Sequence, residues 1–213
     1  MLTFLGYTLV FLALLTSLLL IFRPDYGSRP VLGMGAMGLQ SSPFLLLTMA
    51  FLFEARSLDL VSSYVGEGLP LFYRISAVWG SRSGPLLMWA SMMSVIAWLM
   101  SRDGTTDNVT IRIIHLCTFL LTLISAGLRP FSPAIPGTAG EISPLLQTDL
   151  MVIHPPVVFL YYSLCLATAS IAVAGLVSSK SSKETHASMI PWARYSFLAG
   201  TIGIGLGGLW AYT

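Results

Sequence analysis

The chain contains long apolar runs, each close to the length that a helix needs to cross a lipid bilayer. A spanning helix takes about 20 predominantly apolar residues. Six runs come near that length, at 2–22, 31–53, 84–100, 111–128, 155–177 and 193–212. The second is the weakest, because glycines and Pro43 interrupt it. Charged residues make up 9% of the chain, against about 25% in an average soluble domain. We predict an all-α, polytopic membrane protein with about six transmembrane helices, formed as a single membrane domain over 1–213.

The connections between these runs alternate in length and charge. The regions near 23–30, 101–112 and 178–194 carry seven cations: Arg23, Arg29, Arg102, Arg112, Lys180, Lys183 and Arg194. The two long connections, 54–85 and 129–154, carry four: Arg56, Arg74, Arg82 and Arg129. Cations near helix ends favour the cytoplasmic or matrix side, so we expect the N-terminus and both long loops outside. These loops mix aromatic, apolar and proline residues, which is typical of loops that fold over another part of a structure.

Several function classes are excluded or disfavoured by residue type. The net charge is +2 and the basic residues are scattered, which excludes a nucleic-acid-binding surface. The apolar runs are nearly free of ionisable groups, which argues against a proton, ion or small-solute path. Cys117 and Cys165 lie inside apolar runs, and we interpret them as small hydrophobic residues. No basic residue precedes the run 2–22, so we interpret it as a retained span and not as a signal peptide.

One histidine lies where an apolar run begins, in the segment TDLMVIHPPVVFLYYS at 148–163. Proline suits the first turn of a helix, so Pro155 and Pro156 predict that the span starts there, with His154 at about the N-cap. The helix dipole would then favour the neutral imidazole that a metal requires. His154 is therefore a candidate axial ligand to haem iron, with Asp149 as a candidate acceptor for its other N–H. The alternative is a histidine that only caps the helix.

Other residues of interest have simpler interpretations beside the functional ones. His115, near one end of the run 111–128, and His186, in a polar loop, are interpreted as snorkelling or solvated histidines. An aromatic belt at the outer membrane interface explains most of the aromatic residues near the first long loop: Tyr73, Trp79 and Trp89. Arg74 and Arg82 lie among these rings, and their guanidinium groups are candidates to pair with a haem propionate or another anion.

Three segments of the chain resemble one protein family. They are LPLFYRISAVWGSRSGPLLMWA (69–90), ISPLLQTDLMVIHPPVVFLYYS (142–163) and TIGIGLGGLWAY (201–212). Each is similar to a segment of the CcmF-type cytochrome c haem lyase subunits, in the same order and at similar separations. The spacing from LLQ to HPP is also that of the family.

The resemblance implies a function in cytochrome c maturation. Members of this family attach haem to apocytochrome c through thioethers, and a haem chaperone delivers the haem. The histidine of their HPP motif is an axial ligand to that haem on the outer side of the membrane, and His154 matches it. Haem in transit is therefore the expected cofactor, with His154 as its iron ligand and with Tyr73, Arg74 and Trp79 as further lining residues. No residue of the chain is expected to be catalytic itself.

The chain also departs from the family pattern. It ends after WAY, without the Trp-rich loop that forms the haem platform and without the opposite axial ligand, and SRSGP at 81–85 stands where the family has HEGS. This resembles the N-terminal part of the split CcmF of some mitochondria.

We accordingly expect the mitochondrial inner membrane or, alternatively, a bacterial cytoplasmic membrane. The expected partners are the CcmF fragments with the Trp-rich loop, apocytochrome c and the haem chaperone, and the chain is not expected to be active alone. The alternative function is a haem-free structural subunit of a respiratory assembly.

Overall fold

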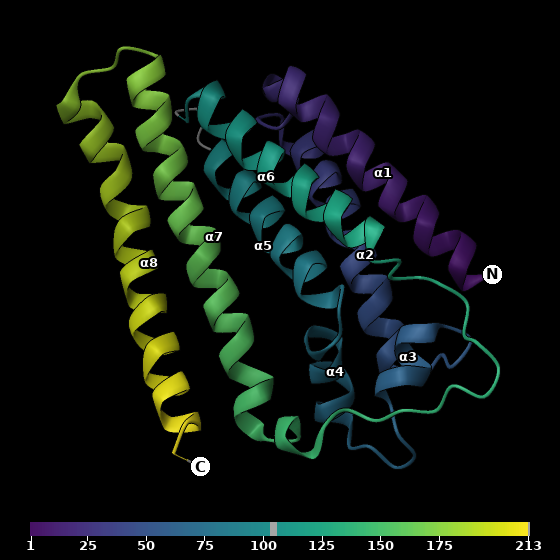
Figure 1. The fold of residues 1–213 in the computed structure, drawn as a ribbon. Helices are drawn as coiled ribbons and strands as arrows, with labels where there is room; N and C mark the ends of the chain where they lie inside the picture. Colours follow the sequence, from purple (N-terminus) through teal and green to yellow (C-terminus); the bar gives the residue numbers. More distant parts are fainter. Residues whose placement is uncertain (103–105, 213) are drawn as a thin grey trace.

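The computed structural model describes residues 1–102 and 106–212, and this part of the chain is helical throughout its regular elements (Figure 1). The elements, in chain order, are α1 (Leu2–Phe22), η1 (Pro24–Tyr26), α2 (Pro30–Leu52), α3 (Asp59–Tyr64), α4 (Leu71–Gly80), α5 (Gly84–Ser101), α6 (Asn108–Gly127), η2 (Pro144–Leu146), α7 (Asp149–Val177) and α8 (Ser182–Trp210). The predicted all-α class is confirmed.

Five of the described helices are long and apolar enough to cross a membrane: α1, α2, α5, α6 and α7. Their bounds follow the predicted runs closely except at the start of α7, and α2 continues through Pro43. The prediction of a polytopic membrane protein is therefore confirmed. The sixth predicted span, 193–212, overlaps α8, which is not among these five. Its first turns are polar and its last turns are rich in glycine, and both features reduce the apolar character of the helix.

The long helices pack as a bundle with α7 and α8 as an antiparallel pair at one side (Figure 1). α1 packs on α2 and α6, whereas α5 contacts α2, α6 and α7. α8 begins at Ser182, earlier than predicted, because Ser181 and Glu184 form a capping box. Because α7 and α8 run in opposite directions, the start of α7 lies beside the end of α8.

The two long loops fold together over one end of the bundle. We call the assembly of residues 53–83, which include α3 and α4, and residues 128–148 the loop cap. Its two parts are joined by backbone hydrogen bonds, including Asp59 N to Ser132 O and Ala134 N to Ser57 O, both at 2.9 Å. Phe131 is fully buried and packs against α1 at Gly6, where a Cβ would overlap the Phe131 ring. The loops therefore form a packed layer, as their composition predicts.

Candidate functional site

The first two turns of α7 carry His154 and both prolines. Thr148 is the N-cap, and its hydroxyl accepts a hydrogen bond from the Met151 N–H at 3.3 Å. α7 therefore begins at Asp149, where a helix dipole favours negative charge. The prediction that the helix starts at Pro155 is wrong, because a capping threonine precedes the prolines. His154 lies in the second turn instead of the N-cap, and the dipole argument, which holds for the first turn, does not apply to it.

The His154 ring packs against the last turns of α8. A Cβ added at Gly207 would lie 2.9 Å from His154 Cε1 and 3.4 Å from Nε2. The Trp210 ring meets the imidazole edge-on, with 5.7 Å between the ring centroids and 73° between the planes. Within the described part of the chain, His154 Nδ1 is buried and has no hydrogen-bond partner. Gly207 thus makes room for an imidazole that has one unsatisfied nitrogen.

Two aromatic side chains of α4 reach the first turn of α7. Trp79 Nε1 donates a hydrogen bond to the Met151 carbonyl at 2.7 Å. The Tyr73 hydroxyl donates to Asp149 Oδ1 at 3.4 Å. Burial, the charge of Asp149 and this bond raise the pKa of Tyr73, so the hydroxyl remains a donor at neutral pH. Asp149 accepts from Tyr73 and Nδ1 of His154 is unpaired, so the described residues do not show the predicted hydrogen bond from His154 to Asp149.

Arg74 also lies on α4, but its guanidinium pairs with an acidic residue of the loop cap. Arg74 Nη1 lies 2.8 Å from Glu54 Oε1, and Nε donates to the Leu69 carbonyl at 2.6 Å. Arg82 likewise pairs with Asp59 at 2.7 Å. The structure thus brings Tyr73 and Trp79 to the helix that carries His154. It places the Arg74 and Arg82 side chains in ion pairs within the loop cap.

The other two histidines differ from each other in environment. His115 is 4% exposed, so its interpretation as a snorkelling side chain is wrong. Its Nδ1 lies 3.2 Å from Gln40 Nε2, and Gln40 Nε2 in turn donates to Ser17 Oγ at 2.9 Å. A glutamine inside an apolar run was the available sequence signal for this buried cluster. His186 is exposed, as predicted, although it lies in the first turns of α8 and not in a loop.

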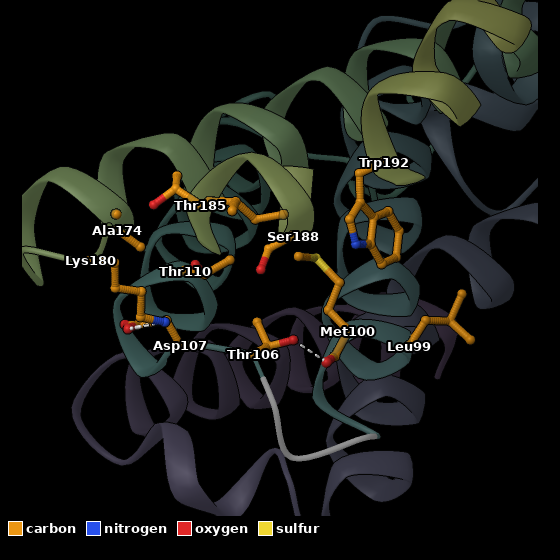
Figure 2. Close-up of a pocket in the computed structure, with 12 residues that line it drawn as sticks. Leu99, Met100, Thr106, Asp107, Thr110, Ala174, Lys180, Thr185, Ser188 and Trp192 are labelled. Atoms are coloured by element: carbon orange, nitrogen blue, oxygen red, sulfur yellow. Dashed lines mark hydrogen bonds and ion pairs between the residues drawn. The ribbon is translucent and has the colours of Figure 1, made fainter. Parts of the chain in front are cut away.

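The end of the bundle away from the loop cap holds a polar pocket of about 190 Å³ (Figure 2). Lys180 Nζ and Asp107 Oδ2 form an ion pair of 2.9 Å at its edge, and Thr185 and Ser188 of α8 line it. Burial acts to raise the pKa of Asp107, but hydrogen bonds from Lys180 and from the Val109 N–H, with the Lys180 charge, outweigh it and lower that pKa. Sequence reasoning missed this pocket because its residues come from four helices, α5 to α8, and from the connections between them.

Comparison with protein families decides the classification. The model of a family described as "Cytochrome C assembly protein" matches residues 79–213, which is more than half of the chain. The chain belongs to the cytochrome c assembly protein family. The matched region contains Trp79, His154 and all of α5 to α8. The suspected resemblance is therefore confirmed at the level of the family.

Curated relatives in this family extend the match to the rest of the chain. The chain is 28% identical to the cytochrome c-type biogenesis protein NrfE of Haemophilus influenzae over 232 aligned positions, which cover 100% of this chain and 36% of that protein. It is 28% identical to CcmF of Escherichia coli, with 79% of this chain and 28% of CcmF covered. It is 30% identical to CcmF of Pseudomonas fluorescens, with coverages of 79% and 27%. The chain thus spans about a third of the length of these relatives. No solved structure matches it significantly.

Proposed function

We propose that this chain takes part in cytochrome c biogenesis as one part of a haem lyase, in which His154 is an axial ligand to the haem that awaits attachment. Membership of the cytochrome c assembly protein family supports the process, and relatives named CcmF support the haem lyase. The role of His154 rests on its own environment. Haem is the substrate here, and the chain contributes by holding it in place.

The unsatisfied Nδ1 of His154 is the observation that carries this proposal. A buried nitrogen without a partner costs about 1–3 kcal/mol, whereas an edge-on aromatic contact such as that with Trp210 is worth about 0.5–1.5 kcal/mol. A bond from this nitrogen to iron would offset the loss of the contacts with Gly207 and Trp210. A rotated imidazole can offer one nitrogen to iron and the other to a hydrogen-bond acceptor, the usual arrangement of a ligating histidine.

The α4 side chains are proposed to form the wall beside this position. Trp79 and Tyr73 already contact the first turn of α7. Arg74 has five N–H donors, and its contacts with Glu54 and Leu69 leave donors for an anionic group such as a haem propionate. The ion pair with Glu54 already compensates the guanidinium charge, so the attraction between Arg74 and an anionic group is weaker than it would be for an unpaired arginine.

The chain matches about a third of the length of its relatives, and we propose that partner chains carry parts of the lyase that lie outside this matched region. These partners would supply the Trp-rich haem platform and the second axial ligand, while a haem chaperone and apocytochrome c would deliver the substrates. The proposed location is the mitochondrial inner membrane or a bacterial cytoplasmic membrane, with the loop cap on the outer side. The proposal assigns no activity to the chain alone.

The test is an optical spectrum of the chain purified together with its co-isolating polypeptides. His154→Ala should lose most of the haem Soret absorbance, whereas His186→Ala, an exposed histidine at the other end of α8, should keep it. Equal haem in both variants would refute ligation by His154. Absence of haem from the wild-type assembly, under conditions that load a control cytochrome c maturation system, would instead support the haem-free structural subunit.

A further inference from the structure

The HPP segment leaves backbone carbonyls of α7 without their helical partners. Pro155 and Pro156 lie inside α7, and proline has no N–H to donate to the carbonyl four residues earlier. The Met151 carbonyl therefore has no donor at residue 155. Within a membrane protein such a carbonyl is costly unless another group pairs with it.

The Trp79 indole pairs with this carbonyl. Nε1 of Trp79 donates to Met151 O at 2.7 Å, which is the short end of the N–H···O range. Trp79 is half-buried and packs against the hydrophobic core of the loop cap, so its position is fixed independently of α7. Met151 itself is 5% exposed, which keeps water from replacing the indole.

We propose that Trp79 is a positioning residue, which replaces the hydrogen bond that Pro155 removes and so fixes the turn of α7 that carries His154. Met151 and His154 are three residues apart and lie on neighbouring positions of one helix face. A shift of the Met151 turn therefore moves the His154 backbone as well. This inference rests on the proposed function for its effect on haem, but its structural part stands without haem.

A double-mutant cycle between Trp79 and Pro155 tests the structural part. Trp79→Phe removes the donor and keeps an aromatic ring, whereas Pro155→Ala restores a backbone N–H to the Met151 carbonyl. Hydrogen exchange of the amides in 149–154 is measured by mass spectrometry in detergent micelles. Loss of one net hydrogen bond should accelerate exchange by roughly three- to tenfold in Trp79→Phe. In the Pro155→Ala background, the same substitution should change exchange by less than about twofold.

Trp89→Phe is the matched control. Trp89 is also half-buried and packs against aromatic rings, but among the described residues its Nε1 has no hydrogen-bond partner. The Trp89→Phe substitution should leave the hydrogen exchange of the amides in 149–154 unchanged. The inference is overturned if Trp79→Phe has the same effect with and without Pro155, or no greater effect than Trp89→Phe.

The haem spectrum tests the functional part in the same purified assembly. Trp79→Phe should retain haem but shift its Soret band or lower its occupancy by roughly threefold, and Pro155→Ala should not add to the shift. An unchanged spectrum in Trp79→Phe, beside haem loss in His154→Ala, would overturn positioning while leaving ligation intact. Haem retained in His154→Ala would refute ligation, and the exchange cycle would still decide the structural role of Trp79.

Discussion

The contact between His154 and Gly207 predicts how a single methyl group will act at the α7–α8 interface. In an exposed helix position, Gly→Ala stabilises by about 0.8–1 kcal/mol. At Gly207 the added Cβ would lie 2.9 Å from His154 Cε1, and relief of such crowding costs about 1–3 kcal/mol. We therefore expect Gly207→Ala to be neutral or to destabilise the fold by up to about 2 kcal/mol.

Gly208→Ala is the matched control, because nothing lies within 4 Å of a Cβ at that position. It should stabilise the protein, so that the two variants differ by about 1–3 kcal/mol in the free energy of unfolding. Unfolding in mixed micelles with increasing denaturing detergent measures this difference.

The origin of the difference is tested by repeating both substitutions in a His154→Ala background. Without the imidazole, Gly207→Ala has no ring to displace and should behave like Gly208→Ala within about 0.5 kcal/mol. If Gly207→Ala remains the less stable of the two by the same margin, the crowding comes from another group. The described packing of His154 against α8 would then be refuted.

Two further predictions concern the loop cap and the opposite end of the bundle. Gly6→Ala should destabilise the protein by about 1–3 kcal/mol, since its Cβ would overlap the buried Phe131 ring. Gly35→Ala is the control, because a Cβ at Gly35 faces open space. Equal unfolding midpoints of the two variants would contradict this prediction. Because the pKa of Asp107 is lowered, its ion pair with Lys180 stabilises the fold above the ordinary carboxyl pKa of about 4 and is lost as the pH falls below it. Lys180 is partly exposed, so Asp107→Asn, which keeps a capping oxygen, should lower the free energy of unfolding at pH 7 by less than about 1 kcal/mol. Between about pH 5 and pH 3, a range that brackets the ordinary carboxyl pKa, the stability of this variant should depend less on pH than that of the wild type.

The positions of the long helices could be predicted from the sequence, because the length of each apolar run decides where a span lies. Apolar length set the spans, and the bounds of α1 and α5 follow the runs almost residue for residue. The start of α7 was not predicted, because two prolines resemble a first turn unless the Thr148 cap is given more weight. Trp79 of α4, which is distant in the sequence, donates to the Met151 carbonyl that Pro155 leaves without a helical donor.

Features that depend on distant partners could not be predicted. Pairing of Asp59 with Ser132 and of Ala134 with Ser57 joins loops that no local pattern connects. Residue chemistry and the family resemblance together selected His154, Tyr73, Arg74 and Trp79. Neither indicated that Glu54 holds the Arg74 guanidinium or that Gly207 faces the imidazole. These contacts follow from how the helices pack, which periodicity does not encode.

The buried cluster of Ser17, Gln40 and His115 has a consequence for how the protein is made. Gln40 bonds a hydroxyl on α1, which precedes it, and an imidazole on α6, which is synthesised 75 residues later. In hydrocarbon, water cannot stand in for the missing partner. If the helices enter the bilayer in the order of their synthesis, the contact between Gln40 and His115 cannot form until α6 has entered it.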